Sequence, residues 1–270
     1  MPELRAPKQI SLQPTRPNIG IVVWYQNRID ALVSQMNKSI VYWVSATWRA
    51  NPPHATMAND ASPAVDLRNA MRKLSRRWIR NFDQAAAEMA GNFAEKTAGH
   101  ADKSLKGILD RAGFSVPFKA TPAMNDAFQA VVSENVALIK SIASEHLTNV
   151  ERLVASSVQT GRDLGTLTDE LQHRYGLTRN RAAFIARDQN NKSTSAMDRA
   201  RKLSLGITKS KWRHSRGGHH PRKSHVEADG TIFETAKGCM IDGELIFPGE
   251  LPNCGCLGQA VIPGFDDDDD

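Results

Sequence analysis

The sequence predicts a mainly α-helical protein, in which an elongated body of long helices is followed by a small β-rich or irregular C-terminal module. Two observations predict this α+β organisation. Apolar residues recur at spacings of three and four through most of residues 21–205, as on one face of a helix. After Gly206 this periodicity is lost, and Gly and Pro become frequent. We therefore divide the chain into an N-terminal arm (1–20), a helical body (21–205), a C-terminal module (206–265) and an acidic tail (266–270).

The first twenty residues are expected to form an extended arm, because the four prolines within them cannot donate to a regular backbone ladder. A first helix is predicted over residues 21–50, and Asn51-Pro52-Pro53 is expected to end it. Its predicted apolar stripe consists of Tyr25, Ile29, Leu32, Met36, Ile40, Val44 and Trp48.

A second helix is predicted from Ser62-Pro63 to about residue 96, since a capping serine followed by proline is typical of a helix start. A separate short helix over residues 102–111, closed by Gly113, is expected to follow. The polar face of the second helix carries a basic row at four-residue spacing, formed by Arg68, Arg72, Arg76 and Arg80. This row is either a solvated helix face or a basic stripe that contacts a partner.

The remaining helical region is predicted to contain three helices. Thr121-Pro122 opens a long one that runs to about residue 160, where Gly161 ends it. A short helix over residues 166–175 is expected to end at Gly176. A last helix is predicted from Thr178 to about residue 205, before Gly206.

The C-terminal module concentrates side chains that bind metals. Short strands are predicted over residues 210–215, 231–234 and 244–247, with turns between them. Zinc prefers four sulfur or nitrogen ligands in a tetrahedron, and two thiols two residues apart on a turn can point at one ion. The candidate ligands are His225, Cys239, Cys254 and Cys256, with His214 as a further candidate. Two interpretations stay open: a structural zinc site, or buried thiols in a loop-rich module.

Composition and charge narrow the function. No apolar run approaches the ~20 residues that a membrane helix needs, and residues 1–20 lack the apolar core of a signal peptide, so we expect synthesis and retention in the cytoplasm. The net charge is +6 even though residues 266–270 are all aspartate. A basic body attracts polyanions such as nucleic acid, although positive charge also serves solubility. The candidate contacts to DNA or to an acidic partner are Arg213, Arg222, Lys223 and the row Arg68, Arg72, Arg76 and Arg80.

The sequence lacks two common catalytic motifs and has one unusually polar stretch within a predicted helix. A phosphate-cradling Gly-Lys-Ser/Thr loop and a Gly-x-Ser-x-Gly elbow are both missing from the sequence, which favours a protein without enzymatic activity. Residues 187–192 are polar in the middle of a predicted helix. We expect them to meet the C-terminal module, with Asp188 pairing with Arg222 or Lys223; an exposed helix face is the alternative.

An ordered set of short motifs runs through the last third of the chain. It consists of Ile185-Ala186-Arg187-Asp188-Gln189 with Lys192, Trp212-Arg213-x-Ser215, Pro221-Arg222-x-Ser224-His225, Asp229-Gly230, Pro248-Gly249-Glu250, Asn253-Cys254-x-Cys256 and Val261-Ile262-Pro263-Gly264-Phe265. Taken in order, these motifs resemble the phage head morphogenesis family, the minor head proteins similar to phage Mu protein F. The family usually has Arg between the two cysteines, whereas this chain has Gly255.

The resemblance implies a structural component of the phage head, present in several copies in the virion and made in the cytoplasm of the host bacterium. It implies association with the portal protein and other head proteins during head morphogenesis, and contact with packaged double-stranded DNA. It implies no membrane partner. The alternative from a different class is an enzyme, a metal-dependent nuclease or a toxin-like enzyme that uses the His/Cys module.

Overall fold

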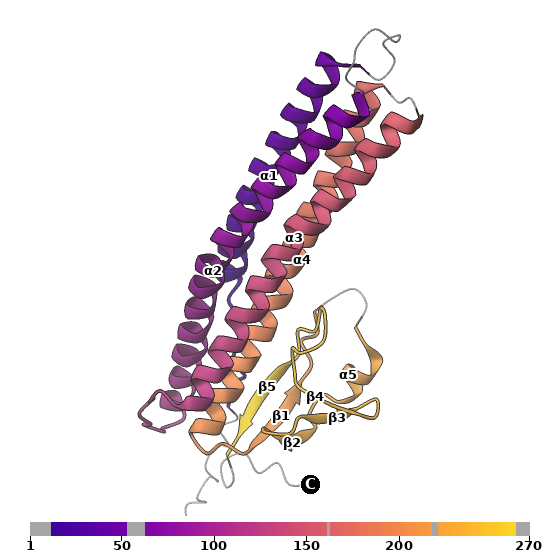
Figure 1. The fold of residues 1–270 in the computed structure, drawn as a ribbon. Helices are drawn as coiled ribbons and strands as arrows, with labels where there is room; N and C mark the ends of the chain where they lie inside the picture. The colour runs from indigo at the N-terminus through magenta and orange to yellow at the C-terminus, as the bar shows by residue number, and fades with distance from the viewer. Residues whose placement is uncertain (1–11, 53–62, 161–162, 218–220, 263–270) are drawn as a thin grey trace, which may run out of the picture. The chain divides into compact units, whose positions relative to one another are not determined.

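Long helices dominate the computed structural model, which describes residues 12–52, 63–160, 163–217 and 221–262 (Figure 1). The four long helices are α1 (Ile19–Ala50), α2 (Pro63–Arg111), α3 (Pro122–Thr160) and α4 (Leu164–Ser204). Short antiparallel strands follow them in the C-terminal part of the chain. The predicted fold class, mainly α with a small β-containing C-terminal part, is therefore confirmed.

Two predicted helix breaks are wrong. Helix α2 continues through Gly99, where the sequence predicted a gap between two helices. Helix α4 likewise continues through Gly176. A glycine inside a helix costs only about 1 kcal/mol relative to alanine, and burial of residues on both sides of Gly99, such as Phe93 and Leu105, outweighs that cost.

Other predicted boundaries are confirmed. Gly113 has a φ of 89° just after α2, and the amide of Phe114 donates to the carbonyl of Leu109 over 2.9 Å, which closes the last turn. Gly206 plays the same part after α4, with a φ of 76°. At the start of α3, the hydroxyl of Thr121 accepts a hydrogen bond from the amide of Met124.

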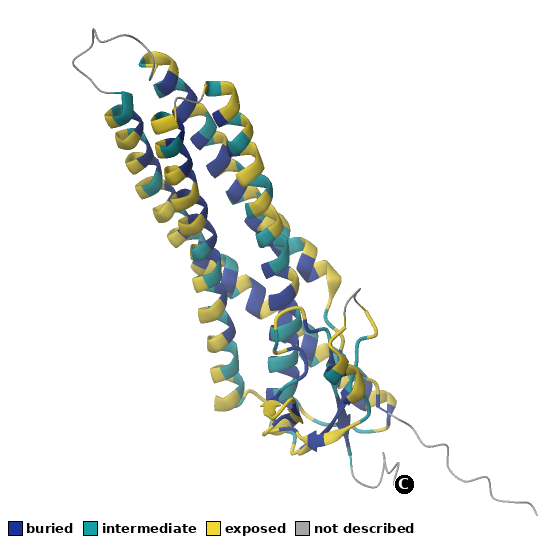
Figure 2. Ribbon diagram, turned by 90° about the vertical axis from the view of Figure 1, so that its right-hand side faces the viewer, coloured by how far each residue is buried: buried dark blue, intermediate teal, exposed yellow. Residues whose placement is uncertain are grey.

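The chain divides into two compact units, of which one is purely helical. This unit comprises Val22–Asn92 and Val132–Ala186. Figure 2 shows buried residues along one side of its helices and exposed residues along the other, as the apolar periodicity requires. One polar pair lies in this core, where the Tyr25 hydroxyl donates to the Asn135 side-chain oxygen over 2.9 Å.

The other unit contains the C-terminal module, together with the chain up to Ile21 and Phe93–Val131. Residues 12–18 have no regular structure, but Leu12 is buried in a cluster that includes Leu105 and Ala260. Arg201, at the end of α4, forms a two-pronged ion pair with Asp102, with N–O distances of 2.8 and 2.6 Å. These contacts join the ends of α2 and α4 to the strands within this unit.

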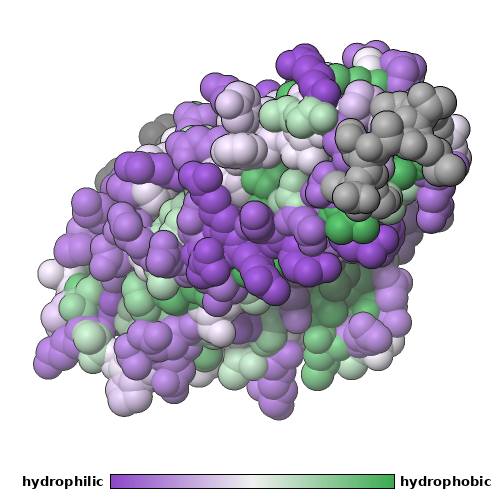
Figure 3. All heavy atoms as spheres, turned by 45° about the horizontal axis from the view of Figure 1, so that its top comes forward, coloured by the Kyte–Doolittle hydropathy of each residue, from purple (hydrophilic) through white to green (hydrophobic). Residues whose placement is uncertain are grey.

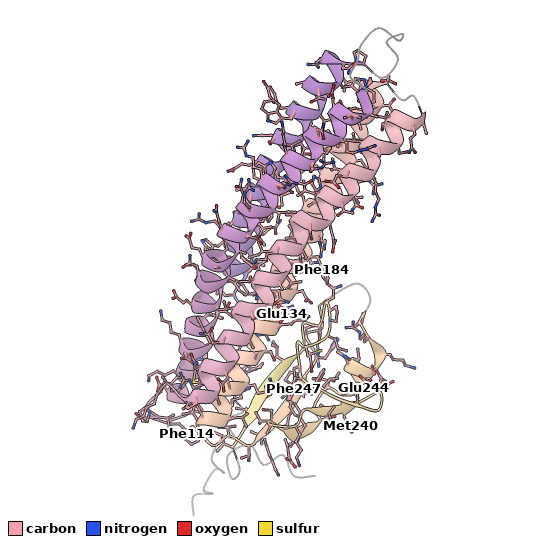
Figure 4. All side chains as sticks on the ribbon, viewed as in Figure 1. Phe114, Glu134, Phe184, Met240, Glu244 and Phe247 are labelled. Carbon is pink, nitrogen blue, oxygen red and sulfur yellow. The ribbon has the colours of Figure 1, made fainter. Side chains whose placement is uncertain are left out.

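Two small sheets and one short helix form the C-terminal module. They are β1 (Lys209–Arg213), α5 (Lys223–Glu227), β2 (Ile232–Glu234), β3 (Cys239–Ile241), β4 (Glu244–Ile246) and β5 (Leu257–Val261). The first sheet is antiparallel with the order β2-β1-β5, and β3 and β4 form a hairpin. Figure 4 shows Met240 and Glu244 on this hairpin and Phe247 just after it. The three predicted strands correspond to β1, β2 and β4, whereas α5, β3 and β5 were not predicted.

Several expectations concern residues outside the described part of the chain. They are the arm over residues 1–11, the Ser62 cap, Gly161, the Pro263-Gly264-Phe265 end of the last motif, and the acidic tail over residues 266–270. On the face shown in Figure 3, hydrophilic side chains cover most of the surface and hydrophobic ones form smaller patches. Among the described helices, none combines the length and apolar character that crossing a bilayer requires.

Candidate functional site

Strand β1 and helix α5 place an aromatic ring against an imidazole at the centre of the module. Trp212 lies on β1 and is completely buried. His225 lies on α5, is 3% exposed, and meets the indole edge to face, with ring centroids 5.2 Å apart and an interplanar angle of 88°. The residues before α5 start the helix, since the Val226 amide donates to the Arg222 carbonyl. The Trp212 and His225 motifs therefore position each other.

The Asp229-Gly230 motif fixes α5 to the end of β1. The backbone of Trp212 accepts from Gly230 over 2.9 Å and donates to Thr231 over 2.8 Å. The Asp229 carboxylate accepts a hydrogen bond from the His214 amide over 3.0 Å. Gly230 has a φ of 93°, a conformation that side chains with a Cβ rarely adopt. This motif is thus explained by backbone geometry.

The Asn253-Cys254-Gly255-Cys256 loop brings two thiols to His225. Asn253 has a positive φ of 59°, and the Cys254 amide donates to the Leu251 carbonyl over 2.9 Å, so the loop turns sharply before β5. Nδ1 of His225 lies 3.4 Å from Cys254 Sγ and 3.7 Å from Cys256 Sγ. All three potential ligand atoms lie within 4.8 Å of one another, and all three side chains are buried. We call these residues the His/Cys cluster.

Polar residues of α4 hold this loop from outside. The Asp188 carboxylate accepts a hydrogen bond from the Asn253 amide over 2.8 Å and also pairs with Lys192 over 3.1 Å. Asn191 donates from its side chain to the Cys254 carbonyl over 3.3 Å. Ser195 donates to the carbonyl of Pro248. The polar stretch over 187–192 therefore meets the C-terminal module, as expected.

The expected partners of Asp188 are wrong. Asp188 pairs with Lys192 and the Asn253 backbone rather than with Arg222 or Lys223. Arg222 instead donates to the carbonyl of Pro252 over 2.9 Å, which adds another hold on the cysteine loop. The sequence shows that Asp188 is a polar residue in the middle of a helix. No local pattern predicts that a backbone amide, that of Asn253, is its partner.

Two glycines allow the loops to approach their neighbours closely. Gly249 has a φ of 81°, and a Cβ there would lie 3.2 Å from Cβ of Ser195 and 3.4 Å from the Asn191 carbonyl oxygen. A Cβ on Gly255 would lie 3.2 Å from the Cβ and Oγ atoms of Ser215. The chain therefore has a glycine between its cysteines at a point where Ser215 approaches the loop.

The two clustered thiols differ in acidity. A hydrogen bond from the Cys256 thiol lowers the pKa of Cys254 to about 5, helped by backbone amides of Cys256 and Gly249 and by the charge of His225, although burial opposes the shift. The same hydrogen bond and burial raise the pKa of Cys256. Negative charge is therefore stabilised at Cys254 Sγ, beside an imidazole nitrogen.

The third cysteine lies elsewhere in the module. Cys239 is 2% exposed and packs in an apolar cluster with Trp212, Ile241 and Ile246. Burial raises the pKa of its thiol. Its sulfur is not among the three ligand atoms within 4.8 Å of one another. All three cysteines belong to the same buried cluster, but only Cys254 and Cys256 bring their sulfurs to His225.

A polar cavity of about 770 Å³ opens beside the cluster. His225, Cys254 and Cys256 contribute to its wall, together with His214, Ser215 and other polar side chains. The ring of His214 accepts a hydrogen bond from the Arg216 amide through Nδ1. His214 therefore faces the same cavity but lies outside the His/Cys cluster.

The basic residues predicted to contact DNA or an acidic partner differ in their surroundings. Arg213 donates to the Gln259 side chain over 2.5 Å and so takes part in the β1–β5 pair. Arg222 and Lys223 are exposed at the start of α5. The four arginines of the predicted row, Arg68, Arg72, Arg76 and Arg80, are all exposed on α2. A role in binding stays a prediction for each of them.

The fold and the site define a class of protein: four long helices followed by a small module that contains the His/Cys cluster. Residues 148–258 match the family model described as "Phage Mu protein F like protein". This stretch contains α4, His225 and both clustered cysteines, and the family resemblance inferred from the motifs is confirmed over it.

Two relatives are similar to the chain over much of its length. An uncharacterized protein of Haemophilus influenzae is 26% identical over 256 residues, which cover 93% of this chain and 55% of that protein. The uncharacterized protein YqbB of Bacillus subtilis is 24% identical over 194 residues, which cover 67% of this chain and 62% of that protein. The chain thus spans little more than half the length of these relatives. No solved structure matches it.

Proposed function

We propose that the protein is a minor head protein of a bacteriophage, a structural part of the virion that acts in head morphogenesis near the portal vertex. The observation that carries this proposal is the family match over residues 148–258, which includes the His/Cys cluster and the helix that holds it. A virion component of this kind needs rigid surfaces for neighbouring subunits, with no catalytic step.

The geometry of the module suits such a structural role. Polar groups around the cysteine loop are used to fix backbone atoms: Asp188 binds the Asn253 amide, Asn191 binds the Cys254 carbonyl and Arg222 binds the Pro252 carbonyl. Hydrogen bonds from side chains to a loop backbone restrict the conformations of the loop. The module would therefore present a constant surface to the portal protein or to another head protein.

Contact with packaged double-stranded DNA is the second part of the proposal. Arg68, Arg72, Arg76 and Arg80 are exposed at four-residue spacing on α2, so successive positions are about 6 Å apart along the helix axis. A row of arginines binds phosphates without reading base sequence, as contact with packaged DNA of any sequence requires.

Quantitative mass spectrometry of purified phage particles and empty precursor heads tests the structural role. The portal and major capsid proteins in the same sample serve as internal copy-number standards. We expect a few copies of the chain per particle in both preparations. Absence from both, with the chain left soluble in the lysate, would contradict a virion component and favour a transient assembly factor or an enzyme.

Chemical cross-linking of the same particles tests the position. A lysine-reactive reagent followed by peptide identification is expected to join this chain to the portal protein more often than to the major capsid protein, after correction for the far larger copy number of the latter. Cross-links confined to the major capsid protein would remove the portal vertex from the proposal while leaving the head role intact.

A further inference from the structure

The two sulfur–nitrogen distances in the His/Cys cluster match those of a tetrahedral zinc site. With Zn–S bonds of about 2.3 Å and Zn–N bonds of about 2.05 Å, a sulfur and a nitrogen ligand of one tetrahedral zinc ion lie about 3.6 Å apart. His225 Nδ1 lies 3.4 Å from Cys254 Sγ and 3.7 Å from Cys256 Sγ. The two distances bracket the ideal value, and all three atoms lie within 4.8 Å of one another.

Burial and ligand type point to the same ion. His225, Cys254 and Cys256 are 3%, 3% and 4% exposed, and both cysteines are free thiols. Two thiols and one imidazole that converge in a protein interior are soft and borderline ligands, which zinc accepts and magnesium or calcium does not. We propose that His225 Nδ1, Cys254 Sγ and Cys256 Sγ bind one zinc ion.

The ligands are arranged before the ion arrives, because separate elements hold each one. Trp212 packs against the imidazole from β1. Asp188 and Asn191 of α4 bind the backbone of the cysteine loop on both sides of the Asn253–Cys254 peptide bond. A preformed site loses little conformational entropy when it binds a metal. The same contacts make the ion a link among β1, α5 and the loop before β5.

The three ligand residues share the wall of the cavity of about 770 Å³, which leaves room for a further ligand beside them. Cys239 is not among the three residues whose ligand atoms lie within 4.8 Å of one another. His214 lines the cavity but lies outside the His/Cys cluster. Three protein ligands leave one coordination position of the zinc open toward this cavity, and the bound ion would link α5 to the loop before β5.

Metal analysis of the full-length protein tests the site. The protein is purified under reducing conditions from cells grown with added zinc, dialysed against metal-free buffer and analysed by inductively coupled plasma mass spectrometry. We expect about one zinc ion per chain. The double substitution C254A/C256A should reduce this to background, whereas Cys239→Ala should retain it. Cys239→Ala is the matched control, because it also removes a buried thiol from the same module.

Cobalt substitution of the wild-type chain covers the case in which C254A/C256A fails to fold. One equivalent of Co²⁺ is expected to give the intense visible bands of tetrahedral cobalt and a near-ultraviolet sulfur-to-metal charge-transfer band, both lost on adding zinc. The proposal is overturned if the wild type retains no zinc and shows no such bands. It is equally overturned if zinc binding survives in C254A/C256A. These results do not depend on where the chain lies in a phage particle.

Discussion

Asp188 is the side chain that ties α4 to the cysteine loop, since its carboxylate accepts the Asn253 amide over 2.8 Å and is 5% exposed. Asp188→Ala leaves that amide without its partner and should lower the free energy of unfolding by about 1–3 kcal/mol. Asp188→Asn retains an acceptor oxygen and should cost less, because only the ion pair with Lys192 is lost. Urea unfolding and hydrogen exchange of the Asn253 amide measure these effects.

The neighbouring residue supplies the control for this series. Arg187 is exposed on the same turn of α4, and Arg187→Ala should change the free energy of unfolding by no more than about 0.5 kcal/mol. Equal effects of Asp188→Ala and Arg187→Ala, with unchanged exchange at Asn253, would show that Asp188 does not hold the loop.

His146 should give the protein a measurable pH dependence. Burial lowers its pKa from 6.5 to about 4, and its Nδ1 bonds to the Thr178 hydroxyl over 2.8 Å. The unfolded state therefore takes up the proton first as the pH falls. Stability contributed by the neutral ring is complete above pH 6.5 and is lost progressively down to pH 4, by up to roughly 3 kcal/mol.

Comparison with His146→Gln isolates this contribution from that of the carboxylates, because Gln keeps a hydrogen-bonding group beside Thr178 but does not titrate. Urea unfolding at pH 7.5 and pH 4.5 should show a larger loss for the wild type than for the variant. Parallel losses in the two proteins would mean that His146 is protonated in the folded state as readily as in the unfolded state.

At the level of residues, the sequence predicted which side chains form the His/Cys cluster better than it predicted which residues of α4 hydrogen-bond to the neighbouring loops. The close spacing of Cys254 and Cys256 predicted that both thiols could meet, and both do meet His225. Cys239 looked equivalent as a candidate, because the alternating burial of strand β3 that turns it into the core was not predicted. Ser195 was missed as an anchor of this region, since its partner is the carbonyl of Pro248, more than fifty positions away in the chain.

At the level of elements, Gly176 tests why a predicted break did not occur. It lies within α4, and a Cβ built on it would meet no atom within 4 Å. Gly176→Ala should therefore raise the free energy of unfolding by about 0.5–1 kcal/mol, because alanine loses less conformational entropy in a helix. Thermal unfolding followed by circular dichroism measures the change. A decrease would indicate that the chain requires a bend or a cap at this position.

Gly249 should respond in the opposite direction to the same substitution. It has a φ of 81°, and an added Cβ would press on Ser195 at 3.2 Å. Gly249→Ala should lower the free energy of unfolding by about 1–2 kcal/mol through the left-handed backbone alone. The same thermal unfolding experiment measures it, and an unchanged or higher midpoint would contradict a left-handed backbone at Gly249.

Strand β5 and helix α5 were not predicted, because their local sequence lacks a clear periodic pattern. Predicted strands corresponding to β1, β2 and β4 carry β-branched, aromatic or alternating residues. Strand β5 contains Gly258 and Gln259, so its alternation is weak, although it pairs with all of β1 from Lys209 to Arg213. Helix α5 has five residues, too few for a 3.6-residue period to appear. Partner strands and packing, not local sequence, specify these two elements.

On the scale of the whole molecule, apolar periodicity and its loss after Gly206 predicted a helical part and a strand-containing part, but not how the chain divides into compact units. The compact unit that holds the strands also takes Phe93–Val131 and the end of α4. Each of the four long helices therefore contributes residues to both units. Long-range contacts such as Arg201 with Asp102 decide this division, and no local pattern reports them.

Because the protein has a net charge of +6, we expect its binding to duplex DNA to weaken as the salt concentration rises. A protein that neutralises a number of phosphates on duplex DNA shows a slope of log binding constant against log salt of about −0.9 for each phosphate. If all four arginines of the α2 row contact phosphates, replacing Arg68, Arg72, Arg76 and Arg80 by Gln should make this slope shallower by about 3.6.

A second variant separates this row from general charge. It replaces four other exposed basic residues by Gln: Arg49, Lys103, Lys119 and Lys209. Both variants lose the same charge, so fluorescence anisotropy with a labelled duplex across a salt series compares position alone. A specific contact predicts a shallower slope for the row variant than for the scattered one. Equal slopes would mean that DNA responds to the charge of the protein rather than to one face of α2.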